Sequence, residues 1–195
     1  IKMSNEVNDF SFCPTIIVTE NTPQREVGDL AEGGIVFYVD ESGQHGLVAA
    51  MEDLEGAYEW GCYQQEVNGA DGIAIGTGYQ NTMDIVSQEC LSENGGVTAA
   101  QATLNAEING YTDWYLPSID ELKLVFHNIA HGAVTNNTNL NDGSYMSSTE
   151  LSATMADGMN FWTNNVPSSF VAEDAGNIGP QFKNALYLIC PIRSF

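Results

Sequence analysis

Basic residues are scarce in this sequence. Its 195 residues include 5 Lys and Arg against 26 Asp and Glu, which gives a formal net charge of −21 at pH 7. Such a chain repels nucleic acid and anionic lipid surfaces, so we predict neither as a partner. The sequence also has no apolar run of the length that spans a bilayer, and we predict that the chain is not embedded in a membrane.

Motifs of catalytic sites are missing as well. The stretch GTGYQN lacks the third glycine of a dinucleotide fingerprint, and a tight turn before a helix explains it better. His127 and His131 have the spacing of a zinc protease motif, but Asn128 stands where the catalytic Glu belongs. There is no GxSxG elbow, and no Ser/His/Asp set stands out. We therefore predict that the protein is not an enzyme.

The four cysteines form no CxxC pair, and their wide spacing disfavours a zinc site. An even number of separated cysteines is typical of disulfides in an exported protein, so we expect an extracellular location. Sequence alone allows three pairings. We favour Cys62–Cys90, because these cysteines flank an irregular segment before a helix, and Cys13–Cys190 is then the remaining pair. Closing the first loop would contribute about 3 kcal/mol in the chain-entropy model.

The amino-terminal part divides into a lead-in and a hairpin. Residues 1–27 carry two prolines and the short apolar run TIIV, and their start does not resemble a signal peptide. We interpret them as a lead-in strand or linker from a preceding region, and we predict one domain over residues 28–195. Two apolar runs in GGIVFYVDESGQHGLVAA flank a polar turn, which predicts a β-hairpin. Residues 52–80 show no clear period and predict an ordered loop.

Two helices are predicted after this loop. The first covers NTMDIVSQEC, with Asn81 as its N-cap. The second covers TAAQATLNAEING, where Thr98 and Gln101 have capping-box spacing and Gly110 stands where a helix should stop.

A third helix follows Pro117. Ser118 and Glu121 form a capping box, and Asp120 favours the same positive helix end. These carboxylates are therefore expected to be structural rather than catalytic. One apolar stripe follows them on the predicted helix, made of Leu122, Val125, Phe126 and Ile129.

The carboxyl-terminal part has short strand-like runs in SYMSSTE, MNFWTN and NALYLICPIRSF. Polar segments at 150–158 and 164–182 separate them and are expected to be loops. The predicted class is α+β, with an amino-terminal hairpin, helices in the middle, and a last strand that returns to the first. Arg193, in the last strand, is expected to form a structural ion pair.

The late polar loops contain the candidate ligand and metal residues. Hard cations such as calcium bind carboxylate, amide and carbonyl oxygens, which these loops offer in abundance. NTNLNDG is not an EF-hand, since Ser148 stands at its twelfth position, so a calcium site would have to combine separate loops. The candidate metal ligands are Glu150, Asp157, Asn160, Glu173 and Asp174. The candidate ligand-binding residues are Asn141, Asp142, Glu150, Asp157, Asn160, Trp162 and Asn164. Solvated carboxylates, and core packing for Trp162, are the competing explanations.

Six stretches in order resemble one family. They are GDLAEGGIVFYVDESGQHGLVAA, WGC, IGTGYQNT, GYTDWYLPSIDELKLVF, YMSSTE and IRSF, and they extend from about Gly28 to Phe195. Together they resemble the C-terminal domain family of the Legionella collagen-like adhesin, although members usually have Trp where this chain has Met146.

The resemblance implies a fold similar to C-type lectins, with an antiparallel sheet, flanking helices and long ligand-binding loops. It also implies that Trp114 and Leu116 are core anchors. Members are attached to surface or secreted proteins and are linked to adhesion. We therefore expect an extracellular adhesin module of a larger bacterial surface protein.

The expected ligand is a carbohydrate or a peptide on a host or neighbouring cell surface. Calcium would assist by supplying the positive charge that the acidic surface lacks. The alternative is a structural cap domain that trimerises a surface fibre. A stable trimer without ligand response would favour that alternative.

Overall fold

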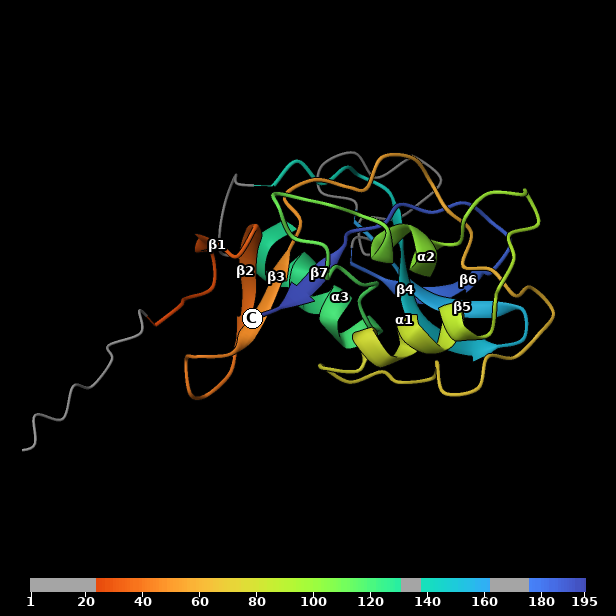
Figure 1. Ribbon diagram of the computed structural model, residues 1–195, viewed down its shortest axis with the longest axis horizontal. Helices are drawn as coiled ribbons and strands as arrows, with labels where there is room; N and C mark the ends of the chain where they lie inside the picture. The colour runs from red at the N-terminus through yellow and green to blue at the C-terminus, as the bar shows by residue number, and fades with distance from the viewer. Residues whose placement is uncertain (1–23, 131–137, 162–175) are drawn as a thin grey trace, which may run out of the picture.

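Two antiparallel sheets and three α-helices form the described part of the chain (Figure 1). The computed structural model describes residues 24–130, 138–161 and 176–195. The first sheet has the order β1 (Leu30–Ala31), β2 (Gly34–Val39), β3 (Gly46–Ala49), β7 (Ile192–Ser194). The second has the order β4 (Ser144–Ser152), β5 (Met155–Asn160), β6 (Ile178–Phe182). This combination of helices and antiparallel sheets confirms the predicted α+β class.

The first sheet contains both the predicted hairpin and the returning last strand. β2 and β3 form the hairpin, with Val36 opposite Val48. β7 pairs with the other edge of β3, where Arg193 is opposite the same Val48. Side chains alternate along β3, so Leu47 and Ala49 face one apolar cluster and Val48 faces another. β3 is therefore buried on both faces and has neighbours from both ends of the domain.

The helices are α1 (Gly78–Ser87), α2 (Ala99–Leu104) and α3 (Ile119–Val125), which continues as a π-helical turn, η1 (Phe126–Ala130). Thr98 accepts a hydrogen bond from the backbone N–H of Gln101, which confirms the predicted cap of the second helix. Ser118 and Glu121 form the predicted capping box. None of the helices in the described ranges is long and apolar enough to cross a bilayer.

Two helix boundaries differ from those predicted. Asn81 lies inside α1 rather than at its start, and its buried amide donates a hydrogen bond to the Ser148 hydroxyl at 3.2 Å. α2 ends at Leu104, well before Gly110. Asn109 and Gly110 instead form a tight turn with φ of 51° and 84°, so the glycine serves a turn and not a helix end.

The second sheet includes segments that were predicted to be loops. β5 begins at Met155, inside the polar segment 150–158, and β6 lies inside the segment 164–182. The sequence of β6, IGPQF, contains Gly and Pro, which normally argue against a strand. Pro180 is tolerated because β6 pairs only with β5 among the described strands and so forms an edge.

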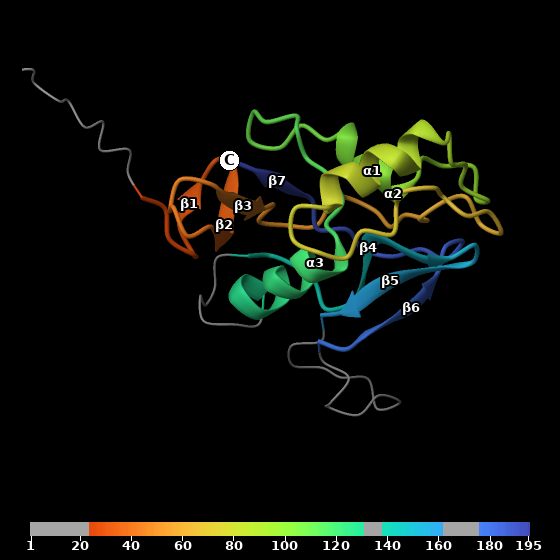
Figure 2. The same ribbon diagram turned by 90° about the horizontal axis from the view of Figure 1, so that it is seen from below.

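Helix α3 lies between the two sheets, as the second view shows (Figure 2), and it contacts β2, β4 and β5. Its apolar stripe shares one buried cluster with residues of both sheets. The main members of this cluster are Ile35, Phe37, Leu122, Val125, Tyr145, Met159 and Ile192. One core therefore joins the two sheets.

Several of the stretches that carry the family resemblance bind one another in the interior. The indole N–H of Trp60 donates to the carbonyl of Ser147 at 3.1 Å. The backbone N–H of Gly76 donates to the Glu121 carboxylate at 2.8 Å. Trp114, within DWYLPS, is fully buried, as the resemblance implied for a core anchor. These side chains of Trp60, Glu121 and Trp114 belong to the scaffold of the domain.

One disulfide fastens the irregular segment before α1. Cys62 and Cys90 are bonded, which confirms the predicted bridge. Cys190 is a free cysteine and fully buried, and burial raises the pKa of its thiol. Its predicted partner Cys13 lies outside the described residues. The Cys13–Cys190 bridge therefore stays a prediction, and the side chain of Cys190 lies in the core that α3 shares with both sheets.

Candidate functional site

The predicted site residues at the start and end of the β4–β5 hairpin serve local polar contacts. Asn141 donates to the carboxylate of Asp53 through its backbone N–H at 3.2 Å and its amide at 2.6 Å. The Tyr145 hydroxyl donates to the other oxygen of Asp53. Asn160 accepts a hydrogen bond from the Ser144 hydroxyl at 2.7 Å. The contacts of Asn141 and Tyr145 hold the start of β4 against Asp53, and the contact of Asn160 joins β5 to β4.

Glu150 and Asp157 do not converge on one site. Glu150 faces the cluster that contains Trp60, where it pairs with Lys183. Asp157 faces the side of α3, where the charge of Lys123 lowers its pKa less than partial burial raises it. Glu150 is opposite Ala156 in the pairing of β4 with β5, so the two share a face of the second sheet. Asp157 is the next residue of β5 and therefore points to the opposite face. We therefore do not assign Glu150 to a calcium site.

Other predicted site residues are exposed or not described. Asp142 is exposed. Trp162, Asn164, Glu173 and Asp174 lie outside the described residues. Within the described ranges, no group of three or more His, Cys, Asp or Glu side chains is placed to hold a metal ion. A calcium site in the late loops stays a prediction.

Glu150 instead belongs to a sealed ion pair. Lys183 is fully buried, and its ammonium donates to the carboxylate of Glu150 and to the carbonyl of Gln65, the latter at 2.8 Å. The ammonium also lies 4.2 Å from the ring centroid of Trp60. The backbone N–H of Val67 donates to both oxygens of Glu150 at 2.9 and 3.0 Å. Every partner comes from a distant segment, so the pair fastens three parts of the fold.

Burial and pairing act oppositely on the lysine of this pair. Burial lowers the pKa of Lys183, and the neighbouring Glu150 partly offsets that effect. Water has no access to the ammonium, and a ligand would have to displace the segment from Trp60 to Val67 to reach it. The chemistry here is structural.

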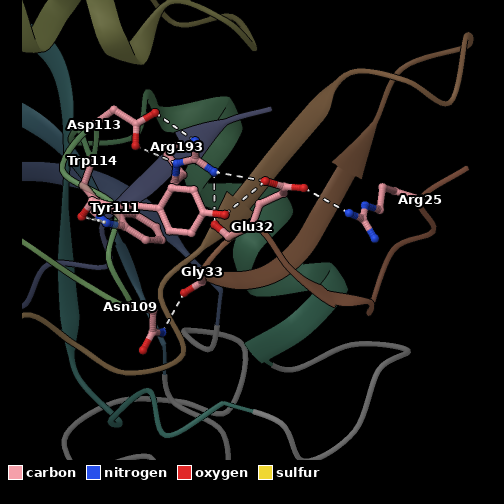
Figure 3. A network of polar contacts seen from close by, with 8 residues as sticks. All are labelled: Arg25, Glu32, Gly33, Asn109, Tyr111, Asp113, Trp114 and Arg193. Atoms are coloured by element: carbon pink, nitrogen blue, oxygen red, sulfur yellow. Dashed lines mark hydrogen bonds and ion pairs between the residues drawn. The ribbon is translucent and has the colours of Figure 1, made fainter. Parts of the chain in front are cut away.

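A second polar network, drawn in Figure 3, includes the partly exposed side chains of Arg25, Glu32 and Asp113. It is centred on Glu32, in the turn between β1 and β2. One oxygen of Glu32 accepts a hydrogen bond from Arg25 at 3.0 Å. The other accepts one from the Tyr111 hydroxyl at 3.3 Å and lies 3.9 Å from the guanidinium of Arg193. Residues of the lead-in, the first hairpin, the 109–114 loop and β7 meet here.

Arg193 forms the fixed part of this network. Its Nε and Nη2 donate to the two oxygens of Asp113 at 2.7 and 2.9 Å, which confirms the predicted ion pair. Its Nη1 donates to the carbonyl of Glu32 at 3.0 Å, and the guanidinium lies 4.1 Å from the ring centroid of Tyr111. Hydrogen bonds from Arg193 hold the pKa of Asp113 below the usual range for aspartate. This arrangement orients the guanidinium in a single position.

A pocket of about 430 Å³ opens beside this network. It is lined by side chains of several chemical kinds: two guanidinium groups, one carboxylate, one amide, one imidazole and one phenyl ring. These are Arg25, Arg193, Glu32, Gln44, His45 and Phe195. Two of the five basic residues of the chain thus line one pocket, although the chain as a whole carries −21 charges. This meeting of two arginines with an imidazole and an aromatic ring makes the pocket a candidate site.

Sequence reasoning missed this pocket. Only the ion pair of Arg193 was expected, and its partner was not identified. The available signal was the scarcity of basic residues: in a chain with so few of them, each one is a candidate for a specific contact. Spacing could not reveal the meeting of Arg25 with Arg193, since it depends on the pairing of β7 with β3.

Comparison with models of known protein families gives no match for this chain. Comparison with curated protein sequences gives no match either. The site therefore has to be interpreted from its own geometry.

Proposed function

We propose that this chain is an extracellular adhesin module that binds carbohydrate on another surface. The pocket beside Glu32 is the observation that supports it most directly. Sugars present hydroxyl groups around an apolar ring face, and a matching site offers planar hydrogen-bonding side chains beside an aromatic ring. Arg25, Glu32, Gln44 and His45 supply the first, and Phe195 supplies the second.

The architecture supports a likeness to C-type lectins. The last strand pairs beside the amino-terminal hairpin, helices flank the sheets, and a second small antiparallel sheet precedes the carboxyl-terminal segment. The Cys62–Cys90 disulfide supports an oxidising, extracellular location. In this proposal residues 28–195 are the binding domain, attached through the preceding residues to a larger bacterial surface protein.

Calcium is a separate part of the proposal. Asp157 and Asn160 would act with Glu173 and Asp174, and the cation would relieve repulsion among the acidic late loops. Millimolar calcium should then raise the melting temperature above its value in chelator, and magnesium should do so less. Identical melting in calcium and in chelator would remove calcium from the proposal.

A glycan array probed with the whole labelled chain tests the function. Binding to a restricted set of glycans, reduced by His45→Ala and unaffected by His127→Ala, is the expected result. The two histidines are both exposed, so the pair is a matched control for loss of an imidazole. Peptide arrays run in parallel distinguish carbohydrate from peptide. Absence of binding to any glycan would contradict the proposal.

A structural cap domain is the second candidate, and one observation favours it. The edge strand β6 exposes Ile178 and Phe182, which are 42% and 51% accessible and lie on the same face of the strand. An exposed apolar edge strand is suited to association with another chain. A stable trimer in light scattering, lost in the variant Phe182→Lys, would support this candidate, whereas a monomer would exclude it.

A further inference from the structure

Glu32 adopts a backbone conformation that glutamate seldom takes. Glu32 and Gly33 form the two-residue turn from β1 to β2, with φ of 52° and 84°. A two-residue hairpin turn with positive φ at both positions usually carries Asn or Gly at the first. Gly33 is required, because a Cβ atom there would lie 2.4 Å from the ring of Tyr111. This strained backbone position leads us to consider a role for the Glu32 carboxylate.

The Glu32 carboxylate accepts a hydrogen bond from Arg25, the arginine of the pocket that still has unpaired N–H groups within the described part of the chain. Arg25 makes a single hydrogen bond, from Nη2 to Glu32, and its other N–H groups have no partner among the described residues. Its side chain is 33% exposed. Arg193 is different, because its bonds to Asp113 and to the Glu32 carbonyl commit it to the scaffold.

Most of the unused hydrogen-bond donors of the pocket belong to the Arg25 guanidinium, a group that cannot accept hydrogen bonds. Gln44 and His45 are exposed, and their side chains make no hydrogen bond to any described residue. Both oxygens of Glu32 already accept hydrogen bonds. A complementary ligand therefore presents acceptor oxygens, and a carboxylate is the acceptor group that matches a guanidinium in two parallel bonds.

We propose that the pocket binds the carboxylate of an acidic sugar, with Arg25 as its anchor and Glu32 as an internal competitor for the same guanidinium. The inference rests on the proposed function and narrows its ligand class. The ligand carboxylate replaces Glu32 at Arg25, while Tyr111 and Arg193 retain Glu32 on its other side. Gln44 and His45 then bond ring hydroxyls, and the ring of Phe195 contacts the apolar face of the sugar.

Competition by Glu32 for Arg25 would make the pocket select acidic sugars over neutral sugars and over small anions. A neutral sugar can accept hydrogen bonds from the free N–H groups of Arg25, but it gains less there than a carboxylate, because it forms no charge-assisted pair of bonds. A small anion that has no sugar ring makes no contact with Phe195 or with the donors of the hairpin turn. Only a ligand that combines both features completes the set of contacts.

The experiment is a titration of the whole chain with glucuronate, in which the NMR chemical shifts of the hairpin turn measure binding. Glucose is the matched neutral sugar, and acetate is the matched carboxylate without a ring. Glucuronate is expected to bind more tightly than either. Arg25→Ala should weaken glucuronate binding about tenfold, the size of one lost charge-assisted contact. Lys123→Ala removes a basic residue on α3, outside the pocket, and should leave binding unchanged.

Glu32→Gln gives the sharpest result, because competition and scaffolding predict opposite signs. If Glu32 competes with the ligand, removing its charge should strengthen glucuronate binding about threefold or more, since the ion pair that the ligand displaces is weaker. If Glu32 only supports the pocket wall, the variant should bind more weakly or equally. A thermal melt of each variant confirms that it is folded.

Each outcome separates the inference from the function on which it rests. Equal binding of glucose and glucuronate, or of acetate and glucuronate, would overturn the acidic-sugar assignment while glycan binding on the array stands. Binding on the array that survives in Arg25→Ala would move the site away from this pocket. If the unaltered chain binds no glycan on the array, the proposed function itself is overturned.

Discussion

Lys183 and Arg193 occupy similar local environments in different parts of the molecule. Each cation lies against an aromatic ring, at 4.2 Å from the Trp60 centroid and 4.1 Å from the Tyr111 centroid. Each is paired with a carboxylate. The ammonium of Lys183 is sealed by three chain segments, whereas Arg193 lines an open pocket beside a second, underused arginine.

The difference teaches that the surroundings of a charge pair decide its role. A sealed pair has lost its hydration and can only stabilise or specify the fold. An open network keeps water and spare donors within reach, so it can exchange one internal contact for a ligand contact. The pKa shifts of the two cations are opposite, in agreement with this difference. Burial lowers the pKa of Lys183, whereas the hydrogen bonds between Arg193 and Asp113 raise the pKa of Arg193.

The largest effect is expected at the sealed pair. Lys183→Met should lower the free energy of unfolding by about 3–5 kcal/mol, because it leaves Glu150 buried without its counter-charge. Urea denaturation measures this. The double variant Lys183→Met with Glu150→Leu should recover much of the loss. Lys123→Met, at an exposed pair with Asp120, is the control and should cost about 0.5 kcal/mol or less. Equal costs at both lysines would erase the distinction between sealed and open pairs.

Opening the disulfide should weaken the seal around Lys183. Cys62→Ser with Cys90→Ser should cost about 3 kcal/mol, because the bridge closes a loop between residues 28 positions apart. The same segment supplies the Gln65 carbonyl to the lysine, so the amine of Lys183 should become reactive toward acylating reagents in the variant. Mass spectrometry of the labelled peptide measures this. An amine that stays unreactive would show that packing alone seals the pair.

An intermediate loss of stability is expected at helix α3, which lies between the two sheets. Ser118→Ala should cost about 1 kcal/mol, because the hydroxyl caps the helix at the N–H of Glu121. Glycan binding should not change, since the capping box belongs to the scaffold. Thermal melting and the array measure the two effects separately. A variant that melts normally but no longer binds would show that this motif contacts ligand.

The smallest effect is expected at the open pair. Asp113→Asn should cost about 0.5 kcal/mol near neutral pH, since the Asp113 side chain is 56% exposed and solvent screens the pair. The pKa of Asp113 is lowered in the folded state, so this stabilisation is present above the pKa of unfolded aspartate. It is lost as the pH falls through the lowered value. The stabilities of the two proteins should therefore converge in acid, as urea titrations at several pH values will measure.

Sequence reasoning succeeded where the signal was local. The capping box of Ser118 and Glu121 and the first hairpin depend on residues close together in the chain, and both were found as predicted. Asn81 was misplaced because a tertiary contact sets the start of α1. A Cβ atom on Gly78 would lie 2.2 Å from the Glu121 carboxylate, so the close approach of two distant motifs fixes the helix start there.

The site was the part least accessible to prediction. Glu150 was assigned to a ligand loop because a carboxylate next to a polar segment resembles a solvated one. Its burial arises only when Lys183 and the 60–67 segment fold around it. Arg25 likewise precedes the first strand in sequence, and it binds Glu32 after that strand. Glu32 itself lies in a turn whose strained backbone no propensity predicts.

The central position of β3 has a consequence for the timing of folding. Val48 must pair with Val36, which is near in the chain, and with Arg193, which nearly the whole domain separates from it. Contacts of such long sequence separation form late, because the chain has to close a large loop before the contact stabilises it. The first sheet and its pocket cannot be completed until the last strand has emerged from the ribosome. The chain is thus kept from completing this sheet, and the pocket beside it, before its last strand is available.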